Sequence, residues 1–130
     1  MEENPKIRRK VCIVDDEASI REIYETALRQ SGFDVVTAID GEDGYRVIVS
    51  EKPDIVLVDI MMPKIDGIAL MKALKADESM SRIPLVVMTN VDDQSVVKKV
   101  GKIDVAFYLI KSLFEPKKVV AIVEEILQNR

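Results

Sequence analysis

The sequence of residues 55–67 is IVLVDIMMPKIDG, an apolar run that ends in Asp59 and leads to Asp66-Gly67. The run up to Val58 is short and rich in β-branched residues, which is typical of a strand buried on both faces of a parallel sheet. A helix is predicted after the glycine, with Asp66 as its cap, because apolar residues recur at helical spacing: Leu70, Met71 and Leu74.

The same alternation of apolar run and amphipathic stretch extends along the whole chain. It predicts five strands, at Val11–Val14, Asp34–Ala38, Ile55–Val58, Leu85–Met88 and Val105–Ile110. Five helices are predicted between and after them, around residues 20–28, 45–49, 70–74, 96–100 and 119–127. Because a parallel return needs a helix to span it, and a barrel needs roughly 200 residues, the pattern predicts an α/β, flavodoxin-like, doubly wound parallel sheet of order 2-1-3-4-5.

Composition limits the classes of protein to consider. The 130 residues fit one domain, expected at 7–130 after a polar leader at 1–6. A net charge of −4 argues against direct nucleic-acid binding, and no apolar run reaches the roughly 18 residues of a membrane span. The single Cys12 indicates a reducing, cytoplasmic setting, and the absence of histidine excludes Ser-His and Cys-His nucleophile pairs and histidine metal sites.

Polar residues follow four of the five apolar runs directly. They are Asp15-Asp16-Glu17, Asp59, Thr89-Asn90 and Lys111. Asp40 follows the second run, but its neighbour Gly41 favours simple turn chemistry there. Ligands of open parallel sheets collect at the carboxyl ends of the strands, so we expect the four groups to converge on one edge.

The charges of that edge indicate what it binds. Asp15, Asp16 and Asp59 outnumber Lys111, and each like-charge pair at ~4 Å costs about 4 kcal/mol at an effective dielectric of 20. A divalent cation would relieve the repulsion, and an oxygen-only donor set favours Mg²⁺, with Mn²⁺ as the second choice. A carboxylate beside such an ion, a lysine and a hydroxyl is suited to receiving a phosphoryl group.

These residues resemble the receiver domain of two-component response regulators, in particular the single-domain, chemotaxis-regulator-like members. The likeness covers roughly Lys10 to Leu127. It rests on four motifs: Val14-Asp15-Asp16-Glu17, Asp59-Ile60-Met61-Met62-Pro63-Lys64-Ile65-Asp66-Gly67, Met88-Thr89 and Tyr108-Leu109-Ile110-Lys111.

The resemblance implies a role for each matching residue. Asp59 is the phosphoacceptor, and Mg²⁺ is bound directly by Asp16 and Asp59, through water by Asp15, and by the backbone carbonyl of Met61. Thr89 and Lys111 contact the phosphoryl oxygens, and Tyr108 is a switch aromatic that turns inward when Thr89 moves. The chain is then a signalling domain that assists its own phosphorylation, and not an enzyme acting on a separate substrate.

The resemblance also implies the partners. A sensor histidine kinase or phosphotransfer protein donates the phosphoryl group, and a downstream protein binds the face of the fourth helix, fifth strand and fifth helix. We expect a stand-alone receiver without nucleic-acid or membrane contacts.

Three departures from the family pattern separate this chain from many members. Ser112 replaces the usual proline after Lys111, so a cis bond there would cost ~3 kcal/mol. Asn90 is larger than the usual residue after Thr89. Asp104-Val105 stands where a Gly-Ala pair often precedes the fifth strand. Met61 and Val91 occupy positions that influence how fast water attacks the acyl phosphate; both are apolar and cannot orient a water molecule, so we predict slow self-dephosphorylation.

Two other functions remain open. One is a receiver-like adaptor that is never phosphorylated, favoured only by Asn90 and the missing proline. The other is a phosphatase of the haloacid dehalogenase type, which needs a second acid two residues after the nucleophile, where this chain has Met61.

Overall fold

A computed structural model describes residues 8–60, 66–89, 98, 100–111 and 115–129 of the chain. Its five parallel strands are β1 (Lys10–Val14), β2 (Asp34–Ala38), β3 (Ile55–Asp59), β4 (Leu85–Thr89) and β5 (Phe107–Ile110), in the order β2-β1-β3-β4-β5. The helices of the described part are α1 (Ala18–Gln30), α2 (Gly41–Glu51), α3 (Gly67–Ala76) and α5 (Pro116–Gln128). The predicted α/β fold and its strand order are therefore confirmed.

The expected helix around residues 96–100 falls mostly outside the described residues. Lys98 and Val100 are helical, and Val100 is buried in the core. The fifth strand begins at Phe107, two residues later than predicted. Ala106 still donates its N–H to the carbonyl of Leu85 at 2.8 Å, so the chain approaches β4 just before the regular ladder begins.

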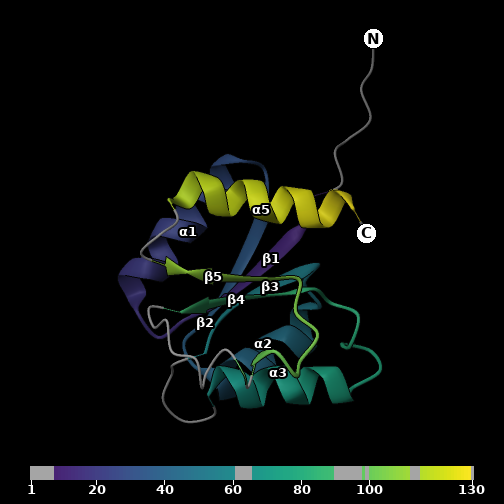
Figure 1. Ribbon diagram of the computed structural model, residues 1–130. Coiled ribbons are helices and arrows are strands. Elements are labelled where there is room, and N and C mark those ends of the chain that lie inside the picture. Colours follow the sequence, from purple (N-terminus) through teal and green to yellow (C-terminus); the bar gives the residue numbers. More distant parts are fainter. Residues whose placement is uncertain (1–7, 61–65, 90–97, 99, 112–114, 130) are drawn as a thin grey trace.

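Helices cover both faces of the sheet, as Figure 1 shows, with α1 and α5 on one face and α2 and α3 on the other. Side chains alternate along each strand, so Ile13 and Leu57 join the core under α1 and α5. Val14 and Val58 join the core under α2 and α3. Burial on both faces explains why the strands have almost continuous apolar sequences.

Gly67 lets the start of α3 approach the end of β3 very closely. A Cβ at this position would lie 2.4 Å from the carbonyl oxygen of Asp59 and 2.5 Å from Cα of Ile60. Both neighbours are backbone atoms, which cannot move aside as a flexible side chain would. The glycine of the quoted stretch is therefore required for packing.

Aspartates cap two of the helices at their first turn. The side chain of Asp40 accepts a hydrogen bond from the N–H of Asp43, and that of Asp66 accepts one from Ala69, each at 2.8 Å. The predicted cap of α3 is thereby confirmed. None of the helices within the described ranges has the length and apolar character that crossing a bilayer requires.

Candidate functional site

The carboxyl ends of four strands bring the predicted site residues to one edge of the sheet. Asp59 and Thr89 are the last residues of β3 and β4, and Asp15 and Lys111 directly follow β1 and β5. Met88 is the register partner of Asp59, and Ile110 is the partner of Thr89. Asp59 and Thr89 thus lie within the ladder, which fixes their backbone positions.

Lys111 is the centre of a cluster of carboxylates. Its Nζ lies 2.6 Å from Oδ2 of Asp15, 3.1 Å from Oδ2 of Asp59 and 3.5 Å from Oε1 of Glu17. The side chains of Lys111, Asp15 and Asp59 are 3%, 0% and 6% exposed, whereas that of Glu17 is 49% exposed. The two buried ion pairs of Lys111 join segments that are 96 and 52 residues apart in sequence. The cluster is accessible to solvent at Glu17.

The environment of Lys111 keeps its ammonium charged. Burial by itself lowers the pKa of a lysine, because it removes water from the charged form. The hydrogen bond to Asp15 and the negative charges of Asp59 and Asp15 outweigh that effect, so the pKa of Lys111 is raised above its ordinary value of 10.5. A permanent positive charge therefore lies beside the carboxylate of Asp59 at neutral pH.

Several hydrogen bonds fix Asp15 and the turn that follows it. Oδ1 accepts the N–H of Glu17 at 2.9 Å, while Oδ2 contacts Lys111. The backbone N–H of Asp15 donates to the carbonyl of Ala38 at 3.1 Å, and its carbonyl accepts Nη1 of Arg21 at 2.7 Å. Hydrogen bonds to Ala38 of β2 and Arg21 of α1 therefore fix the position of Asp15 in the site.

The carboxylates that could share a cation are not the set expected from the sequence. Oxygen atoms of Asp15, Glu17 and Asp59 all lie within 4.8 Å of one another. Asp16 is exposed and is not part of this group among the described residues. The donors are all hard carboxylate oxygens, so their chemistry fits Mg²⁺ or Mn²⁺.

The predicted phosphoryl and switch residues occupy different depths. Thr89 is fully buried at the end of β4. Tyr108 on β5 is half-buried, packs against the core under α2 and α3, and lines a hollow of about 550 Å³ with residues 100–105. Met61, Asn90, Val91 and the Lys111–Ser112 bond lie outside the described residues.

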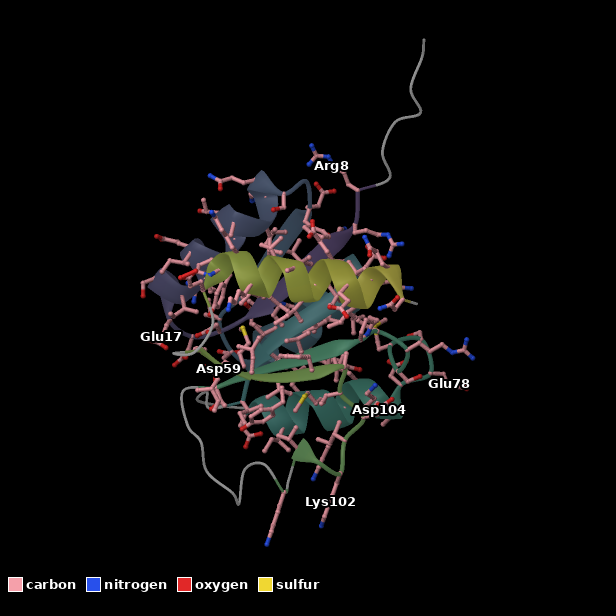
Figure 2. The ribbon with its side chains drawn as sticks, turned by 45° about the horizontal axis from the view of Figure 1, so that its top comes forward. Arg8, Glu17, Asp59, Glu78, Lys102 and Asp104 are labelled. Atoms are coloured by element: carbon pink, nitrogen blue, oxygen red, sulfur yellow. The ribbon has the colours of Figure 1, made fainter. Side chains whose placement is uncertain are left out.

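Glu17 is the site residue that sequence reasoning missed. Glu17 follows the first apolar run together with Asp15 and Asp16, but of these three residues the resemblance implies roles only for Asp15 and Asp16. One signal was present in the sequence: glutamate is not among the preferred N-cap residues, yet Glu17 stands where the first helix begins. Figure 2 shows Glu17 and Asp59 at the same end of the molecule, far from Glu78.

Similar proteins carry the same arrangement of elements. Residues 11–124 match the family described as the response regulator receiver domain. The REC domain of AraT, a response regulator from Geobacillus stearothermophilus, is 29% identical and superposes with a TM-score of 0.82 over 95% of each chain.

Two curated relatives are longer than this chain. The "Probable transcriptional regulator ycf27" of Guillardia theta is 40% identical over 122 residues, which make up 94% of this chain and 46% of that protein. The alkaline phosphatase synthesis transcriptional regulatory protein PhoP of Bacillus subtilis is 37% identical over 126 residues, 95% of this chain and 50% of that protein. The chain thus spans about half the length of these relatives.

Proposed function

This chain belongs to the response regulator receiver domains, and on that premise we propose that it accepts a phosphoryl group on Asp59 and thereby switches a protein-binding surface. The observation that carries the proposal is the buried pair of Asp59 and Lys111, whose Oδ2 and Nζ are 3.1 Å apart. A carboxylate next to a fixed ammonium group can act as a nucleophile whose phosphorylated product is stabilised by the same ammonium.

The phosphoryl group must come from a partner protein. A sensor histidine kinase or phosphotransfer protein would present phosphohistidine, since this chain contains no histidine. A carboxylate oxygen of Asp59 attacks phosphorus and forms a P–O bond. The P–N bond breaks, its electron pair returns to the imidazole, and the imidazole takes up a proton from water. Asp59 is left as an acyl phosphate, with Lys111 and Thr89 bound to its phosphoryl oxygens.

A magnesium ion would complete the charge balance of this site. The carboxylates of Asp15, Asp16 and Asp59 and the carbonyl of Met61 would hold it, and Mn²⁺ could replace it. When bound, the ion neutralises the charge of the phosphoryl oxygens. The fit of the donor set supports this role, because the oxygens of Asp15 and Asp59 lie within reach of one ion.

The switch would run from the end of β4 to the surface beside β5. Phosphorylation replaces the single charge of Asp59 with roughly two and draws Thr89 and Lys111 toward the phosphoryl group. Tyr108 precedes Lys111 by three residues and lines the hollow formed with residues 100–105. Its inward movement would reshape that surface, where a downstream protein binds.

Acetyl phosphate tests the proposal without a kinase. With Mg²⁺ present, we expect the wild-type chain to gain the mass of one phosphoryl group and Asp59→Asn to gain none. Asp34→Asn is a matched control, because it makes the same chemical change at the start of β2, the opposite end of the sheet from Asp59, where Asp34 pairs with exposed Arg8. We expect this control to be phosphorylated like the wild type.

Two results would replace the proposal with one of its rivals. An unchanged mass in all three proteins would favour the unphosphorylated adaptor, and sustained turnover of p-nitrophenyl phosphate would favour a phosphatase. If the phosphoryl group is lost within seconds after acetyl phosphate is removed, the prediction of slow self-dephosphorylation is wrong.

A further inference from the structure

The first residue before α1 is placed like a helix cap but does not act as one. Glu17 has extended backbone angles, and its side chain makes no capping hydrogen bond. Asp40 and Asp66, at the corresponding positions of α2 and α3, both accept the expected backbone N–H. Glu115, at the corresponding position of α5, makes no capping hydrogen bond either, so helix capping does not explain the glutamate at position 17.

The side chain of Glu17 is directed to the acidic site instead. Its Oε1 is 3.5 Å from Nζ of Lys111, and its carboxylate is within 4.8 Å of those of Asp15 and Asp59. The turn that carries it is held in place, because the N–H of Glu17 donates to Oδ1 of Asp15 and its carbonyl accepts the N–H of Arg21.

The negative charge of Glu17 exceeds what Lys111 needs for neutralisation. Asp15 and Asp59 approach the ammonium more closely, at 2.6 and 3.1 Å, and both are buried. Glu17 is the most distant of the three and is half in solvent. It is therefore the carboxylate best able to turn toward an ion that enters from solvent, since its movement breaks the weakest of the three contacts.

We propose that Glu17 is a further carboxylate of the divalent-cation site, beside those of Asp15, Asp16 and Asp59, and donates an oxygen that raises the affinity of the unphosphorylated chain for Mg²⁺. This inference rests on the proposed function, because it assumes that the site binds a cation. It adds a ligand for which the resemblance implies no role, because Glu17 lies in the first matching motif but is not among its metal ligands.

The test measures magnesium binding directly, without a phosphoryl donor. Isothermal titration with MgCl₂ would compare the wild type, Glu17→Gln and Glu78→Gln. The two variants lose the same charge, but Glu78 lies at the other end of the molecule in Figure 2. Removing one half-exposed charge beside the ion should weaken binding about fivefold, whereas Glu78→Gln should leave it unchanged.

Salt dependence and folding provide the controls. The difference between Glu17→Gln and the wild type should shrink as NaCl is raised, because a half-exposed charge is screened by salt. Thermal unfolding in EDTA should give similar midpoints for both, since Glu17 makes no capping bond. Equal magnesium affinities for Glu17→Gln and Glu78→Gln would overturn the inference.

Failure of this inference can be told apart from failure of the proposed function. Phosphorylation of Asp59 with unaltered magnesium affinity in Glu17→Gln would reject only the role of Glu17. Weakened magnesium binding in Glu17→Gln, with no phosphorylation of the wild type by acetyl phosphate, would reject only the phosphoacceptor function.

Discussion

Lys10 and Lys111 lie at opposite ends of the sheet, and both pair with carboxylates from distant segments. Nζ of Lys10 lies 2.9 Å from Oε1 of Glu51, with side chains 32% and 42% exposed. Nζ of Lys111 lies 2.6 Å from Oδ2 of Asp15, with both side chains almost completely buried. The distances are similar, but the surroundings differ.

The surroundings of each ion pair decide how much it contributes to the stability of the fold. Water and salt screen the pair at the amino end, where Lys10 also donates its backbone N–H to Oδ2 of Asp54 at 2.7 Å. At the carboxyl end, each charge has lost most of its water and depends on its partners. The first pair joins the end of α2 to the sheet, whereas the second joins the ends of β1, β3 and β5 through one buried ammonium group.

Lys111→Met should have the largest effect, because it leaves the buried carboxylates of Asp15 and Asp59 without their positive partner. We expect the free energy of unfolding to fall by about 3 kcal/mol, measured by urea titration in EDTA. Added Mg²⁺ should restore part of the loss by replacing the missing positive charge. A loss of less than about 1 kcal/mol would mean that the carboxylates are better solvated than their burial indicates.

Gly67→Ala should have the next largest effect, because it disturbs the backbone that carries Asp59 without changing any charge. The new Cβ would meet the carbonyl oxygen of Asp59, so α3 or the end of β3 must shift. We expect a loss of about 2 kcal/mol in urea unfolding and slower phosphorylation by acetyl phosphate.

Gly32→Ala is the control for that substitution. Gly32 has a positive φ of 97°, which strains an alanine there, but nothing lies within 4 Å of the added Cβ. The strain is therefore confined to the backbone at residue 32 and does not involve Asp59. It should cost stability without slowing phosphorylation. Equal slowing by both variants would show that reduced stability alone, and not the position of Asp59, controls the rate.

Lys10→Met should have the smallest effect, and it makes the same substitution as Lys111→Met at an exposed ion pair. The hydrogen bond from the backbone N–H of residue 10 to Asp54 remains, and the interactions lost are the exposed ion pair with Glu51 and the hydrogen bond from Nζ to the Glu51 carbonyl. We expect the urea midpoint to stay within the error of the measurement at physiological salt. A loss as large as that of Lys111→Met would remove burial as the cause of the difference between the two ends.

Much of the fold could be predicted because it depends on local pattern. The β-branched runs and the helical spacing between them predicted five strands, their parallel order and the helices of the described part. The motifs around Asp15, Asp59, Thr89 and Lys111 predicted the receiver family, which the comparison with known proteins confirms. The roles of these residues in phosphorylation remain predictions.

Other features depended on how side chains extend in three dimensions. The pattern did not indicate that Asp59 and Thr89 would be the last ladder residues of their strands, because that requires the partners Met88 and Ile110. Nor did it separate Asp16, which is exposed and lies outside the carboxylate group of the described residues, from Glu17, which reaches Lys111 from a turn anchored by Asp15.

By itself, the order of residues determined which segments become strands and helices and which polar groups come to the edge of the sheet, because hydrophobic periodicity and parallel pairing act through backbone geometry. Only the tertiary structure decided which carboxylates surround Lys111 and how deeply each is buried. Distances between side chains 52 to 96 residues apart follow from strand register and packing, and the strength of an ion pair follows from the water that packing removes.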